Sequence, residues 1–227
     1  MHFTEDMFEQ AVIELFENMG YTHIYAPDMD RDYSSPLLDA VLMDSLVKLN
    51  KGLPLDAINE AISKLRNFDT GSLLQKNMQF MDYLQNGIPV SCFVKGEERN
   101  SIVYLIDYKI VTNNSFYVVN QFTYIENGNN RRPDIILFIN GLPLVLMELK
   151  SPSKDEVNAE NAYNQIRNYM QDIPSIFNYN AICVISDPQI ASASWTPAGR
   201  NFVIIATVLV GASDSTKIGA AAAGQAA

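Results

Sequence analysis

One stretch, RRPDIILFINGLPLVLMELK at residues 131–150, constrains the fold of this 227-residue chain more than any other. The run 135–139 is apolar and rich in β-branched residues, which is typical of a buried strand. Asn140-Gly141 follows, and both residues tolerate the positive φ angles of a tight turn. The run 144–149 is apolar again. The sequence therefore predicts a β-hairpin.

The returning strand ends in charged residues. Side chains on a strand alternate between its two faces, which places Glu148 and Lys150 on the same face as Leu144 and Leu146. Burying a carboxylate and an ammonium on an apolar strand is costly unless something compensates. A divalent metal held by Asp134 and Glu148, with Lys150 beside it, would compensate.

Composition and charge exclude several classes of protein. No apolar run approaches the ~20 residues that a bilayer requires, and the acidic, amphipathic start MHFTEDMFEQ is not a signal peptide. We therefore expect a cytoplasmic protein with Cys92 and Cys183 as buried free thiols. The net charge of −10 is unusual for a protein that holds DNA alone, so we expect only weak DNA binding by the isolated chain.

Missing residue types narrow the chemistry further. The two histidines, His2 and His23, lie outside the predicted hairpin, which argues against His-dependent nucleases, HExxH zinc hydrolases and Ser-His-Asp catalysis. The chain contains no GxxxxGK[ST] motif. Any use of ATP would therefore require a motor domain that is not in this chain.

Hydrophobic periodicity predicts helices followed by a sheet. Thr4 is a suitable N-cap and Gly20 a suitable stop for the first helix. The expected helices are 4–19, 37–50, 54–67, 73–85 and 156–171, and the expected strands are 90–95, 102–110, 116–125, 135–139, 144–149 and 181–186. This order predicts one three-layer α/β domain with a mixed central sheet over residues 1–200. Within this domain, residues 4–87 form an N-terminal helical segment and residues 90–187 form the sheet core. A divergent or truncated tail (201–227) follows the domain.

Several short motifs accompany the hairpin at characteristic spacing. They are Asn120-Gln121-Phe122, Arg132-Pro133-Asp134, the Asn140-Gly141-Leu142-Pro143-Leu144 turn, Glu148-Leu149-Lys150-Ser151-Pro152, and Gln165 with Tyr169 four residues later. Together they resemble the PD-(D/E)xK nuclease signature with its Gln-x-x-x-Tyr addition. More specifically, they look like the N-terminal nuclease domain of the motor (R) subunit of type I restriction enzymes. The resemblance covers roughly residues 1–187.

The resemblance implies a Mg²⁺-dependent endonuclease (a type I site-specific deoxyribonuclease) with a restriction-endonuclease-like fold. Asp134 and Glu148 would hold the metal, and Lys150 would orient or deprotonate the attacking water or stabilise the transition state. Gln165 and Tyr169 share a helix face and would contact Lys150, a water or a DNA phosphate. Before the resemblance is considered, a Glu-Lys ion pair at an exposed strand end and a polar shoulder of a buried helix are the better explanations of these residues.

The roles of four further residues stay open. The backbone carbonyl of Leu149 is a plausible third metal ligand. Glu9 on the first helix is either an extra ligand or part of a solvated helix face, and the solvated face is the simpler reading. Arg131 and Arg132 either touch a phosphate or lie on the surface.

The resemblance also implies partners. The expected activity is cleavage of double-stranded DNA within an ATP-dependent restriction complex that includes modification (M) and specificity (S) subunits. Two alternatives are a nuclease-like docking module with little activity of its own and a stand-alone PD-(D/E)xK repair nuclease. The acidic net charge disfavours the stand-alone enzyme.

Overall fold

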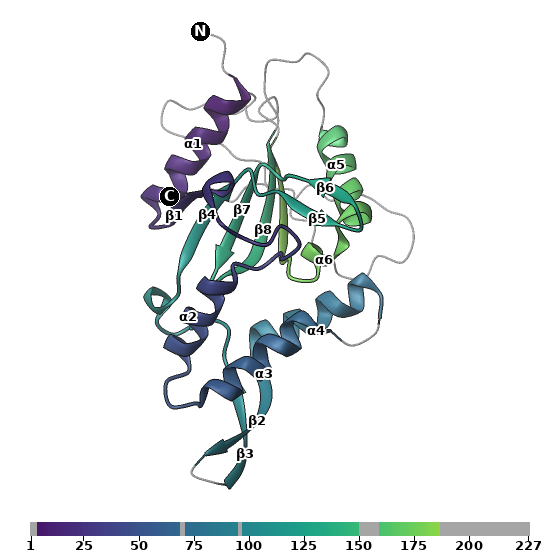
Figure 1. Ribbon diagram of the computed structural model, residues 1–227. Coiled ribbons are helices and arrows are strands. Elements are labelled where there is room, and N and C mark those ends of the chain that lie inside the picture. The colour runs from purple at the N-terminus through teal and green to yellow at the C-terminus, as the bar shows by residue number, and fades with distance from the viewer. Residues whose placement is uncertain (1–3, 69–70, 95–96, 150–158, 187–227) are drawn as a thin grey trace.

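A five-stranded mixed sheet forms the centre of the protein (Figure 1). The computed structural model describes residues 4–68, 71–94, 97–149 and 159–186. The strand order is β1-β4-β7-β8-β9, with strands β1 (Thr22–Tyr25), β4 (Phe116–Asn120), β7 (Ile135–Ile139), β8 (Leu142–Leu149) and β9 (Ile182–Ser186). The β4–β7 and β7–β8 pairs are antiparallel, whereas β1–β4 and β8–β9 are parallel. The predicted mixed sheet is confirmed.

Helices cover both faces of the sheet and make three layers (Figure 1). On one face, α1 (Glu5–Asn18) packs Val12 and Ile13 against a strip that includes Met147 and Leu149. The opposite face carries α5 (Ala159–Asp172) and α6 (Pro174–Phe177). Because β8 and β9 are parallel, the chain must cross over between them, and it does so through α5 and α6. The predicted three-layer α/β fold is confirmed.

A second group of elements extends from one end of the sheet (Figure 1). It contains α2 (Asp39–Leu49), α3 (Leu55–Arg66) and α4 (Leu73–Asn86), together with an antiparallel hairpin of β2 (Ile88–Val94) and β3 (Glu97–Val103). Their apolar side chains share one core with Leu142 and Leu144 of β8. Short elements complete the chain: the 3-10 helices η1 (Ala26–Asp28) and η2 (Val111–Asn113), and the hairpin β5 (Tyr124–Glu126) and β6 (Asn129–Arg131).

The Asn140-Gly141 turn joins the sheet to this helical group. Both residues have positive φ, +52° and +83°, as the predicted tight turn requires. The Asn140 amide is fully buried: it donates to the Leu105 carbonyl at 2.8 Å and accepts from the Ser115 N–H at 2.7 Å. A Cβ at Gly141 would lie 2.7 Å from the backbone of α2, so only glycine fits there.

Local expectations for the helices are confirmed. The Thr4 side chain caps α1 by accepting from the Met7 N–H at 3.3 Å. The helices expected at 37–50, 54–67 and 73–85 are α2, α3 and α4. The helix expected at 156–171 is α5 from Ala159 onward, and its first three predicted residues lie outside the described part of the chain.

Two predicted strands are too long, and two short strands were missed. The strand expected at 102–110 ends at Val103, because the Asn50 side chain bonds the backbone of Tyr104 and the Asp107 carboxylate accepts the N–H groups that follow it. The strand expected at 116–125 leaves the sheet after Asn120, where Gln121 adopts a φ of +57°. The missed strands are β1, which lies inside the segment predicted to be only helical, and β6, which pairs with β5.

The remaining expectations concern the two cysteines, membrane-spanning helices and the C-terminal tail. Cys92 and Cys183 are buried free thiols, as predicted. Within the described ranges, no helix is long and apolar enough to cross a membrane. The tail predicted at 201–227 lies outside the described residues.

Candidate active site

Two carboxylates meet at the end of the central hairpin. Asp134 directly precedes β7, and Glu148 is the last residue but one of β8. The register pairs Ile135 with Met147, so one step further along the hairpin brings Asp134 opposite Glu148. The Leu149 N–H donates to Asp134 Oδ2 at 2.7 Å, which fixes the orientation of the Asp134 carboxylate. The hairpin geometry therefore brings together the two residues that the sequence singled out as metal ligands.

Glu148 is a charged residue in an apolar environment. Only 1% of its surface is exposed, and its neighbour on the same strand face, Leu146, belongs to the core beneath α5. The Tyr169 hydroxyl of α5 donates to Glu148 Oε2 at 3.3 Å. A buried carboxylate needs such compensation, because leaving it unsolvated would cost several kcal/mol.

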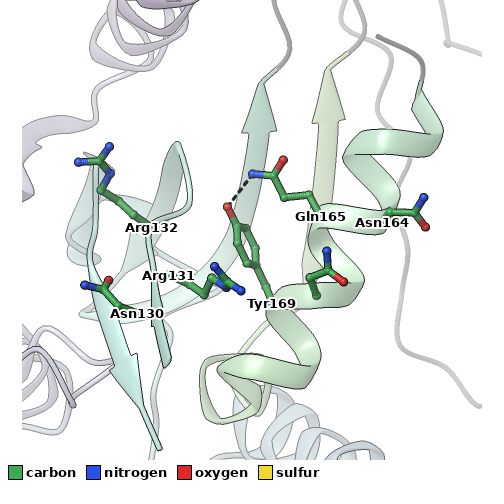
Figure 2. A pocket seen from close by; sticks show the side chains of 7 residues that line it. Asn130, Arg131, Arg132, Asn164, Gln165 and Tyr169 are labelled. Carbon is green, nitrogen blue, oxygen red and sulfur yellow. Dashed lines mark hydrogen bonds between the residues drawn. The ribbon is translucent and has the colours of Figure 1, made fainter. Parts of the chain in front are cut away.

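Gln165 and Tyr169 form a short relay toward Glu148. Gln165 Nε2 donates to the Tyr169 hydroxyl at 2.8 Å (Figure 2). That hydroxyl donates onward to Glu148. Burial raises the pKa of Tyr169 above its usual value, and the negative charge of Glu148 raises it further. The phenol therefore stays protonated at neutral pH, as a donor to Glu148 must.

Glu9 lies at the same end of the sheet and is not a solvated helix residue. Its carboxylate accepts from Asn120 Nδ2 at 2.7 Å and from Gln121 Nε2 at 2.8 Å. Gln121 in turn donates its backbone N–H to the Asp134 carbonyl at 3.1 Å, and the His23 ring bonds Asn120 Oδ1 at 2.9 Å. The simpler sequence interpretation of Glu9 was wrong. The hydrogen bonds of Glu9 join residues more than 100 positions apart, which helix periodicity alone does not reveal.

The donor set suits a hard divalent cation. Asp134 and Glu148 offer carboxylate oxygens, and the Leu149 carbonyl is next in the chain, which matches the oxygen ligands and retained waters that Mg²⁺ prefers. Among the described residues, no group of three or more His, Cys, Asp or Glu side chains could hold a metal ion. Side chains would thus supply two ligands. Lys150, the remaining predicted catalytic residue, lies outside the described residues, so its role stays a prediction.

A polar cleft of about 390 Å³ opens beside Tyr169 (Figure 2). It runs between β6 and α5, and is lined by Asn130, Arg131, Arg132, Asn164, Gln165, Asn168 and Tyr169. Arg131 turns toward α5, where its guanidinium bonds Asp172, with Nε 2.7 Å from Oδ2. The sequence offered no signal for this ion pair, because Arg131 and Asp172 are 41 residues apart.

The fold and this site define a class. A mixed sheet flanked by helices, with an acidic pair at the end of a hairpin, is a restriction-endonuclease-like α/β fold. Comparison with known families then identifies the chain further. It belongs to the family described as "Type I restriction enzyme R protein N terminus", which matches residues 2–194.

Individual relatives agree with this assignment. The chain is 32% identical to the "Type I restriction enzyme HindI endonuclease subunit" of Haemophilus influenzae over 82% of its own length and 19% of the relative. It is also 32% identical to the "Putative type I restriction enzyme MjaIXP endonuclease subunit" of Methanocaldococcus jannaschii, over 79% of its own length and 18% of the relative. The chain thus spans less than a fifth of each of these relatives.

Proposed function

We propose that this chain is a Mg²⁺-dependent endonuclease module of a type I restriction enzyme R subunit. It would hydrolyse phosphodiester bonds of double-stranded DNA when assembled with motor, modification and specificity parts. The observation that carries the proposal is the pairing of Asp134 with the buried Glu148, held by the Leu149 N–H and the Tyr169 hydroxyl. The names of the relatives, which are endonuclease subunits, support the same reaction.

The burial of Glu148 supports a catalytic role over a purely structural one. A structural ion pair would be more stable at the strand surface, where water solvates both charges. Here the carboxylate instead lies beneath α5, and Asp134, which directly precedes the neighbouring strand, lies opposite Glu148 in the hairpin register. Two adjacent carboxylates repel each other, and a bound cation relieves that repulsion. Perturbed, clustered acids of this kind are common at functional sites.

Each residue has a distinct task in this mechanism. When bound between Asp134 and Glu148, Mg²⁺ would supply charge neutralisation at the phosphate and make a water more acidic. The Leu149 N–H holds the Asp134 carboxylate in one orientation. Tyr169, oriented by Gln165, keeps Glu148 in one rotamer by donating to Oε2. By strand alternation Lys150 would share the face of Glu148, and it would hold the attacking water or accept its proton.

The experiment that tests the proposal separates cutting from translocation. In the assembled enzyme, Asp134→Ala and Lys150→Ala should each reduce plasmid cleavage by at least ~10²–10³-fold, as losing one key electrostatic group typically does. ATP hydrolysis and strand displacement should remain near wild type, because the chain carries no ATP-binding motif. Asp44→Ala, which removes the same charge from an exposed position on α2, is the matched control.

Two results would contradict the proposal. Lys150→Ala that cuts at the wild-type rate would remove Lys150 from the mechanism. Asp134→Ala that stops ATP hydrolysis as completely as cleavage would show that this region is not a separable nuclease. A subunit that assembles but never cuts, with or without Mg²⁺, would instead favour the docking module.

A further inference from the structure

The cleft between β6 and α5 differs from the rest of this acidic chain. The chain as a whole carries a net charge of −10. The described residues that line the cleft, however, are four with side-chain amides, one tyrosine and two arginines, and none of these seven carries a carboxylate. Amide N–H groups, the phenol and the guanidinium groups are all hydrogen-bond donors. The cleft therefore offers hydrogen-bond donors and arginine side chains in a chain of negative net charge.

The two arginines of the cleft differ in their partners. Arg131 is directed toward α5 (Figure 2). It forms an ion pair with Asp172, so its charge is neutralised within the protein. Asn129 adds a second contact between β6 and α5 by donating to the Asp172 carbonyl at 3.1 Å. Arg132 is exposed and projects away from α5 in Figure 2. Within the described ranges, no ion pair or hydrogen bond engages the Arg132 side chain.

We propose that Arg132 and the amide side chains of this cleft bind the sugar-phosphate backbone of duplex DNA next to the phosphate that is cut. This inference rests on the proposed nuclease function and adds the surface that positions the substrate. Arg132 supplies the charge that pairs with a phosphate. The amides of Asn164 and Asn168, one turn apart on α5, supply uncharged donors.

The position of the cleft supports this assignment. Tyr169 belongs both to the cleft lining and to the relay that reaches Glu148, so the cleft and the acidic pair share a wall. Arg132 precedes Asp134 by two residues, and the intervening Pro133 is buried, which restricts the backbone between them. A strand of DNA whose phosphate reached the acidic pair would therefore pass next to Arg132.

The chemistry of the lining predicts backbone contact without sequence recognition. Arginine and amide donors to phosphate oxygens position DNA but carry no information about its bases. Each phosphate that a cation neutralises releases counterions, so the affinity falls with salt, with a slope of about 0.9 per contact in a log-log plot. One unpaired arginine should therefore account for about one such unit. This weak binding is consistent with the acidic net charge of the isolated chain.

The test is a binding titration in the absence of any divalent metal. Fluorescence anisotropy of a labelled DNA duplex is recorded with the full chain over a series of low salt concentrations. Arg132→Gln should weaken binding and reduce the salt slope by about 0.9, whereas Arg132→Lys should keep the slope, because lysine still pairs with a phosphate as a point charge. Arg131→Gln is the matched control and should leave the slope unchanged while lowering the melting temperature, because it breaks the ion pair with Asp172.

The outcomes are separable from those of the cleavage assay. An unchanged slope in Arg132→Gln, an equal loss of slope in Arg131→Gln, or no measurable duplex binding even at the lowest salt would overturn the proposal. A reduced slope in Arg132→Gln alone supports it, even if the assembled enzyme proves unable to cut. Normal cleavage combined with an unchanged slope would leave the nuclease function intact and refute only the cleft.

Discussion

Tyr169→Phe removes a single oxygen atom from the centre of the candidate site. The phenol accepts from Gln165 at 2.8 Å and donates to Glu148 at 3.3 Å, and Tyr169 is only 5% exposed. The substitution keeps the ring and its packing against the sheet. What it removes is the donor that orients the buried carboxylate, so its effect should be on cleavage more than on folding.

The distance sets the expected magnitude. Hydrogen bonds to charged groups contribute about 1.5–3 kcal/mol, and 3.3 Å is long for an O–H···O bond, so the lower end of that range applies. A loss of ~1.4 kcal/mol corresponds to about tenfold in rate. Cleavage by Tyr169→Phe should therefore fall about tenfold, much less than the loss expected for Asp134→Ala.

The chain offers a matched control at Tyr179. This tyrosine is as buried as Tyr169, at 4% exposed, but its hydroxyl donates to the Leu65 carbonyl at 2.9 Å, far along the chain from the acidic pair. Tyr179→Phe should lower the free energy of unfolding by about 1 kcal/mol and leave cleavage by the folded enzyme unchanged. Plasmid cleavage, ATP hydrolysis and thermal melting are measured on the same preparations.

Two results would refute this reasoning. Tyr169→Phe cutting at the wild-type rate would show that Glu148 needs no donor from α5. An equal loss of cleavage in Tyr179→Phe would show that the effect is one of stability and not of the site.

Two further predictions concern stability and reactivity. Asn140→Ala should lower the free energy of unfolding by roughly 3 kcal/mol or more. The substitution leaves the buried Leu105 carbonyl and Ser115 N–H without their partner and puts alanine at positive φ. Urea unfolding measures the effect, and a change below about 1 kcal/mol would contradict the prediction. Cys92 and Cys183 should not react with a thiol reagent at pH 8 in the native protein and should both react after unfolding, because both are buried and burial raises the pKa of Cys183 to about 12. Rapid labelling of the native protein would place at least one thiol at the surface.

The sequence alone determined the features that depend on near neighbours. The Asn140-Gly141 turn, the alternation that places Leu146 and Glu148 on one face, and the Thr4 cap were all predictable, because turn geometry, strand parity and capping involve residues only a few positions apart. The pairing of Asp134 with Glu148 followed from the same hairpin, and the family motifs added its interpretation as a nuclease site.

Tertiary structure decided everything that depended on distant partners. Glu9 meets Asn120 and Gln121 across more than 100 residues, and Arg131 meets Asp172 across 41. Hydrophobic periodicity identifies which face of an element is buried but not which element will cover it, so no pattern in the sequence could pair these groups. The same limit explains the overlong strand at 116–125: its residues favour a strand throughout, but Gln121 turns out of the sheet where its N–H reaches the Asp134 carbonyl and its side chain reaches Glu9. The site thus combines a hairpin specified by local sequence with a surrounding polar network that only the folded chain can assemble.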